Sequence, residues 1–269
     1  MRDRPVPTLP PILRAKDYAA PSVFLPENML REARRQKHLP LAPVPDICVL
    51  DPDGDLLRAL HVEGRTRACP AWACYHTTLE LTEHEGETFG IVGRAVGAAF
   101  AVLVAEQLFA SGCSLLLSVT SAGQLVATGP TPYFVLIDRA LRDEGTSYHY
   151  LPPAVFADAD SALVDCVMAA FGADPLTLHR GASWTTDAPF RETEAAIAAA
   201  REQGAVAVEM EAAALYAFAR ARQRDVLCFA HVTNQMAQVE GDFEKGEADG
   251  ATASLAVIAA AAAAWRSFR

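Results

Sequence analysis

The chain has few basic residues for its length: 23 Lys and Arg stand against 33 Asp and Glu, which gives a formal net charge of −10. A protein of that charge repels nucleic acid and anionic membrane surfaces. The first residues also lack the apolar core with which a secreted protein begins. We therefore expect a cytoplasmic protein that binds neither nucleic acid nor a membrane.

Clustered cysteines and long hydrophobic runs are missing too. The closest cysteines, Cys69 and Cys74, have no histidine-rich partner segment, so the sequence predicts no metal site. The longest apolar run, 255–265, is dominated by Ala and falls short of the roughly 20 residues that span a bilayer, which indicates a packed C-terminal helix. No serine-hydrolase elbow, Walker phosphate loop or His-Glu-x-x-His motif is present, which excludes three large enzyme classes.

What the sequence does contain is a regular alternation of apolar segments, and 51% of its residues are hydrophobic. Short apolar runs predict strands at 47–50, 89–92, 115–119, 133–137 and 226–232. Helical spacing predicts helices at 27–37, 98–111, 191–203, 211–223 and 249–268. This order favours a single α/β domain with a central mixed β-sheet flanked by helices, spanning 46–269. The proline-rich segment 1–45 is expected to form an N-terminal arm.

Two carboxylates flank a methionine where a strand gives way to a helix, at Glu209-Met210-Glu211. One interpretation is structural, since a glutamate favours the positive end of a helix dipole. The other is a sugar site, because a carboxylate can accept two hydrogen bonds from a vicinal diol and methionine offers an apolar wall.

Two further segments carry groups that bind anions. Gly54 and Arg58 follow the first strand, and a glycine backbone with a guanidinium four residues later suits an oxyanion, although a surface turn is an equal alternative. Ser118-Val119-Thr120-Ser121-Ala122-Gly123 ends the third strand and offers hydroxyls and amides. The sequence thus predicts one anion site made by two loops.

Together these segments resemble the nucleoside phosphorylase family of uridine phosphorylase, hexameric purine nucleoside phosphorylase and methylthioadenosine nucleosidase. The resemblance runs from about Ile47 to the C-terminus and includes 142–147 and 185–190. It implies cleavage of a nucleoside by phosphate, without metal or organic cofactor, in a homo-oligomer such as a dimer or hexamer. The residues it assigns are Gly54, Arg58 and Ser121 for phosphate, Glu209, Met210 and Glu211 for ribose, Phe190, Asn234 and Gln235 for the base, with Arg58, Glu211 and Asn234 catalytic.

The chain departs from that family at both ends of the expected site. Ser118 stands where phosphorylases usually have an arginine, and Arg65, Arg67 or Arg94 could supply a replacement cation. Asn234 stands where purine-specific members have an aspartate, and an amide cannot protonate a base. Two alternatives to phosphorolysis therefore remain: a hydrolytic nucleosidase, and a nucleoside-binding protein without activity.

Overall fold

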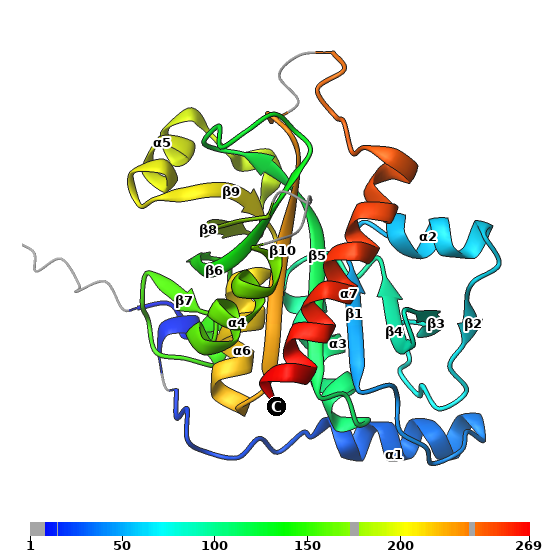
Figure 1. Cartoon of the computed structure of the whole chain (residues 1–269). Coiled ribbons are helices and arrows are strands. Elements are labelled where there is room, and N and C mark those ends of the chain that lie inside the picture. The colour runs from blue at the N-terminus through cyan, green and yellow to red at the C-terminus, as the bar shows by residue number, and fades with distance from the viewer. Residues whose placement is uncertain (1–8, 15, 173–177, 237–239) are drawn as a thin grey trace, which may run out of the picture.

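The computed structural model describes residues 9–14, 16–172, 178–236 and 240–269 (Figure 1). Its strands are β1 (Ile47–Asp51), β2 (Arg67–Ala68), β3 (Glu80–His84), β4 (Glu87–Gly93), β5 (Leu115–Gln124), β6 (Tyr133–Asp143), β7 (Phe156–Asp158), β8 (Leu178–Thr186), β9 (Ala205–Glu209) and β10 (Asp225–Asn234). Its α-helices are α1 (Pro26–Lys37), α2 (Asp55–Val62), α3 (Ala98–Ala110), α4 (Ser161–Phe171), α5 (Glu194–Glu202), α6 (Ala212–Arg222) and α7 (Ala251–Phe268).

The strands form one mixed sheet that closes on itself at one side. Its order is β10-β6-β8-β9-β5-β1-β4-β3-β2, and β10 also pairs with β5, so five strands form a ring. β1, β5 and β10 run parallel to one another, whereas β9 runs antiparallel to β5. Because parallel strands end at the same edge of a sheet, the loops after β1, β5 and β10 meet there.

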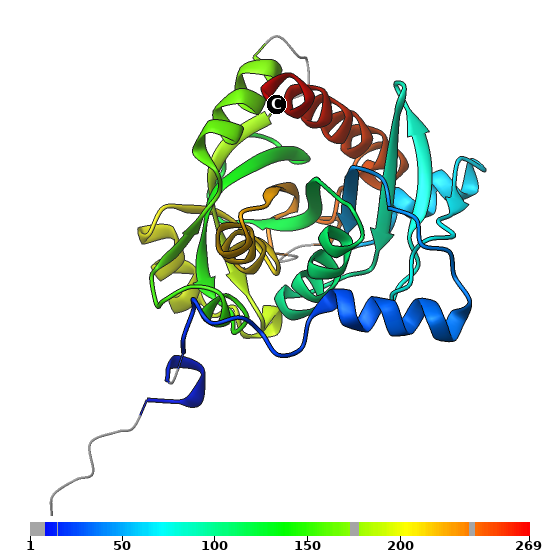
Figure 2. The ribbon, with the colours of Figure 1, turned by 90° about the horizontal axis from the view of Figure 1, so that it is seen from below.

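Helices cover the sheet on more than one side (Figures 1 and 2). One core cluster joins α3 and α6 to the sheet, and a second joins α2, α4 and α7 to it. A smaller cluster lies under α5 and includes Trp184 and Val208. α6 is alanine-rich, and every residue from Ala212 to Ala219 is buried, because small side chains let the helix approach its neighbours closely.

The C-terminal helix belongs to the core, as its sequence predicted. Among the described residues, Glu247–Phe268 is the one helical segment long and apolar enough to span a membrane, but 61% of it is buried inside the protein. Trp265 near its end packs in the second cluster, and its indole Nε1 donates to Asp225. The apolar face of α7 therefore packs against the rest of the protein.

The structure confirms the α/β class and the mixed sheet, and all five predicted strands are present. Two helices, α2 and α4, and the strands β2, β3, β7 and β8 were missed. Part of the expected arm is integrated into the domain, since Leu30 and Ala33 of α1 are buried against Ala73. Residues 1–8 and 15 of the arm lie outside the described residues.

Candidate functional site

Glu211 is the most unusual carboxylate at the edge where the strands end. It lies directly before α6 and is only 1% exposed. One oxygen, Oε1, accepts a hydrogen bond from the Gly97 amide at 2.7 Å, while Oε2 is buried with no partner among the described residues. Burial, with a further contribution from the Glu209 carboxylate, raises the pKa of Glu211 to about 8. A buried acceptor without a donor needs one from outside the described residues, and a bound water or a ligand hydroxyl can supply it.

Glu209 has the opposite character, because all its lone pairs are in use. Its Oε1 accepts from the hydroxyls of Ser183 and Thr185, and its Oε2 accepts from the amides of Glu211 and Ala212 at 2.7 Å. An ionised carboxylate has about four acceptor positions, so Glu209 has none left for a ribose. It ties β8 and β9 to the start of α6 and so holds Glu211 in place. The sequence placed Glu209 in the ribose site, and its contacts give it this positioning role instead.

The first of the predicted anion loops is closed by its own aspartates. Gly54 adopts a left-handed conformation, with φ 78°, and its amide donates to the carbonyl and the carboxylate of Asp51. Asp51 is buried, which raises its pKa to about 6. The Gly54 amide, expected to bind phosphate, is therefore already bound by the chain.

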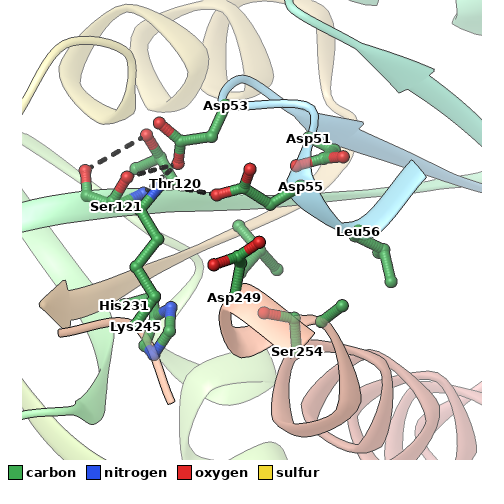
Figure 3. A pocket seen from close by; sticks show the side chains of 12 residues that line it. Asp51, Asp53, Asp55, Leu56, Thr120, Ser121, His231, Lys245, Asp249 and Ser254 are labelled. Atoms are coloured by element: carbon green, nitrogen blue, oxygen red, sulfur yellow. Dashed lines mark hydrogen bonds and ion pairs between the residues drawn. The ribbon is translucent and has the colours of Figure 1, made fainter. Parts of the chain in front are cut away.

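The second loop is closed in the same way, by Asp53. Its Oδ2 accepts from the amide of Ser121 at 2.7 Å and also from the Ser121 hydroxyl, across 68 residues of sequence (Figure 3). A carboxylate oxygen thus lies where the sequence predicted a phosphate oxygen. Asp53 is also close enough to Glu211 that its charge helps to raise the Glu211 pKa.

Two cations around these loops, Arg58 and Lys245, are paired as well. Arg58 contacts Asp55 at 2.6 Å and Asp249 at 2.9 Å, with its side chain 52% exposed. Lys245 contacts the other oxygen of Asp55. Two positive side chains therefore face two carboxylates, and Arg58 is not among the residues that line the cavity between the loops.

That cavity is small, and four of its twelve lining residues are aspartates. Its volume is about 20 Å³, which has room for a water molecule but not for a nucleoside. Figure 3 shows Asp51, Asp53, Asp55 and Asp249 around it, with Lys245 crossing between them. His231 also lines it, stacked on the Phe134 ring at 4.4 Å.

His231 is held in a neutral form, since burial lowers its pKa to about 4. Its Cε1 would lie 2.3 Å from a Cβ on Gly250, so the start of α7 packs directly against the imidazole. These contacts pack the His231 ring against both Phe134 and the start of α7.

The three residues expected at the base are placed differently from one another. Asn234 is buried, its Oδ1 accepts from the Met236 amide and its Nδ2 donates to Thr233, which leaves one amide hydrogen without a partner among the described residues. Gln235 is exposed, and its backbone amide donates to Asp242. Phe190 is 99% exposed, so its ring is not buried in a pocket of this chain.

β5 carries no cation at Ser118, the position where the phosphorylases that this sequence resembles have an arginine. Ser118 is buried, and its hydroxyl has no partner among the described residues. Of the three possible replacement arginines, Arg65 pairs with Glu63 and Arg67 lies 3.9 Å from Glu83, both around β2. Arg94 alone of the three contacts the first loop, at Gly54.

The sequence missed several residues that build this site. Asp53 belongs to the segment singled out as the first loop, but its pairing with Ser121 depends on a fold contact that no local signal carries. The Gly97 amide donates to Glu211, and the sequence signals this contact only by a glycine in a loop. Lys245 and Asp249 come from the segment before α7, which was assigned no role.

A closed mixed sheet flanked by helices is the fold that this chain shares with solved nucleoside phosphorylases. The chain belongs to the phosphorylase superfamily, whose family model matches residues 32–269. This confirms the resemblance found in the sequence, and it makes the chain a member of a superfamily of enzymes that act on nucleosides.

Solved structures with this fold include both phosphorylases and a nucleosidase. Uridine phosphorylase from Vibrio fischeri ES114 is 18% identical with a TM-score of 0.67, over 84% of this chain and 91% of its own. Purine nucleoside phosphorylase from Toxoplasma gondii is 13% identical with a TM-score of 0.68, over 83% and 93%. The 5′-methylthioadenosine/S-adenosyl homocysteine nucleosidase from Campylobacter jejuni is 17% identical with a TM-score of 0.61, over 81% and 94%.

Proposed function

We propose that this chain is a nucleosidase, which cleaves the bond between the base and the pentose of a nucleoside with water as the nucleophile. The observation that carries the proposal is the state of the predicted phosphate site. Gly54, Ser121 and Arg58 are bound to Asp51, Asp53 and the Asp55–Asp249 pair respectively. A phosphate dianion would have to displace these carboxylates or lie against them.

The energetic argument favours water over phosphate. Each charge-assisted bond that a phosphate gains here replaces one that already exists, so the gain of about 1.5–3 kcal/mol per bond is largely cancelled. Repulsion from the nearby aspartates acts against the anion as well. Water is neutral and fits the cavity of about 20 Å³ between the two loops.

In this mechanism Glu211 holds the sugar and Asp53 handles the proton. The free Oε2 of Glu211 accepts from a ribose hydroxyl, with Met210 beside it as an apolar wall. Asp53 orients the water and accepts its proton as the oxygen bonds to the anomeric carbon. The bond to the base breaks with its electron pair on the base, where the free Asn234 amide hydrogen stabilises the developing charge and solvent supplies the proton.

The nucleosidase proposal and phosphorolysis, which the sequence resemblance favoured, predict different dependences of the initial rate on phosphate. We expect the initial rate on the best nucleoside of a panel to be constant from zero to about 10 mM phosphate, a range above most Michaelis constants. The product should be free pentose. A rate that requires phosphate, with pentose 1-phosphate as the product, would refute the nucleosidase proposal.

A third outcome has its own meaning. Measurable nucleoside binding without any product, over the whole panel, would identify a binding protein that has lost activity. The absence of a metal or organic cofactor from the reaction stays a prediction, and full activity after exhaustive dialysis against a chelator would support it.

A further inference from the structure

Arg94 is a cation of the site that neither the sequence motifs nor the proposed reaction uses. It lies between β4 and α3, three residues before the Gly97 amide that holds Glu211. Its backbone has φ 63°, and its amide donates to the Asp51 carbonyl at 2.8 Å. Side chains other than Gly, Asn and Asp rarely adopt this left-handed conformation, and those that do are concentrated at functional sites.

The Arg94 side chain lies directly on the first loop. A Cβ on Gly54 would be 3.0 Å from its Cγ and 3.4 Å from its Nε. The arginine stem can occupy this space only because residue 54 has no side chain. Gly54 therefore places the guanidinium of Arg94 beside the loop that carries Asp53.

The guanidinium of Arg94 is also free, in contrast with its neighbours. Arg58 and Lys245 are paired with Asp55, whereas Arg94 is exposed and makes no side-chain hydrogen bond or ion pair with any residue that the structure describes. A guanidinium offers a planar fork of donors that matches two oxygens of a phosphoryl group. Three residues further along the chain, the Gly97 amide holds Glu211, whose buried Oε2 also has no partner among the described residues.

We propose that Arg94 binds a phosphoryl group at the mouth of this site, and that the group is carried on the sugar of the substrate, as in a nucleoside phosphate. The placement rests on the proposed function, in which Glu211 holds the same sugar. Free phosphate has the same chemistry and is the other possible source. A sugar-linked phosphate fits better because Asp53 already occupies the donors of Ser121, and among the described residues beside the two loops Arg94 is the cation without a side-chain partner.

The test compares ribose 5-phosphate, ribose and inorganic phosphate as calorimetric ligands of the wild type and of Arg94→Gly. Glycine suits a positive φ, so this variant should be at least as stable as the wild type, and a loss of binding cannot be attributed to unfolding. We expect ribose 5-phosphate to bind at least about tenfold more tightly than ribose, and Arg94→Gly to lose about ten- to a hundredfold of that affinity. Arg94→Lys should recover part of the loss, because it keeps the charge without the fork.

Arg67→Met is the matched control, since Arg67 is an exposed arginine of β2 that is remote from both loops in the sheet order. It should bind ribose 5-phosphate as the wild type does. The inference is overturned if ribose 5-phosphate and phosphate bind no better than ribose, or if Arg94→Gly binds them normally.

The same experiment separates this inference from the proposed function. Binding of inorganic phosphate that Arg94→Gly abolishes, together with a rate that needs phosphate, would keep Arg94 as the anion-binding residue and refute the nucleosidase. Phosphate-independent cleavage of nucleosides, with no preference for nucleoside phosphates and no effect of Arg94→Gly, would refute the inference and keep the nucleosidase.

Discussion

Replacing Glu211 by glutamine should stabilise the ligand-free protein in alkaline solution. Burial raises the Glu211 pKa from its ordinary 4.5 to about 8, so the folded protein must keep a proton that the unfolded chain gives up. Below pH 4.5 both states are protonated and the site costs nothing. As the pH rises to about 8 the free energy of unfolding falls by about 1.4 kcal/mol per pH unit, and above pH 8 the loss is complete at about 5 kcal/mol.

Glutamine keeps the shape of the side chain and can still accept from the Gly97 amide, but it does not titrate. Glu211→Gln should therefore melt close to the wild type at pH 5 and higher than the wild type at pH 8.5, by something of the order of ten degrees for a chain of this size. Scanning calorimetry without ligand at the two pH values measures this. Glu202→Gln, at an exposed glutamate of α5, serves as the control and should show no such difference. An equal shift at both pH values, or a less stable variant at pH 8.5, would refute the reasoning.

Four further predictions follow from the site. Glu211→Ala should lose about ten- to a hundredfold in kcat/KM with the circular dichroism spectrum unchanged, because it removes the hydrogen bond between Oε2 and the sugar. Asp53→Asn should lower kcat by about 10²–10⁴ with little change in KM, as expected for a lost general base. A loss in kcat accompanied by a rise in KM would indicate that Asp53 binds the sugar instead. Arg58→Ala should leave the melting temperature and the steady-state rate nearly unchanged, because the Arg58 side chain lies at the surface. The protein should sediment as a homo-oligomer at micromolar concentration, and a monomer would contradict the oligomer that the sequence resemblance implies.

The parts of the fold that local patterns encode were predictable from the sequence. β1, β5 and β10 are continuous apolar runs because they are buried on both faces, and such runs stand out. β8 was missed because Leu178–Thr186 mixes polar and small residues and so has no continuous apolar run. α2 was missed because eight residues give little periodicity, and its stability comes from packing against α7 and the sheet.

For the site, the sequence predicted Glu211 and its surroundings but not the state of the anion loops. The segment 209–211 stands out because two glutamates flank a methionine at a helix start, yet their different roles depend on Ser183, Thr185 and Gly97. The pairing of Asp53 with Ser121 joins residues 68 positions apart. Such contacts exist only once the sheet has formed, so no spacing rule could have predicted them.

The burial of α6 divides the site into a rigid side and a compliant side. Glu211 is attached to a helix that is enclosed along Ala212–Ala219, so moving it would require the core to repack. The opposite side consists of the ion pairs of Arg58 with Asp55 and Asp249 and of Lys245 with Asp55, and the exposed pair of Arg58 with Asp249 costs little to break. A nucleoside held by Glu211, as proposed, needs room beside the cavity that holds one water, and making that room costs least on this second side. Selectivity for the sugar therefore depends on the rigid side that carries Glu211. The rate at which a nucleoside enters depends on the side that carries the ion pairs.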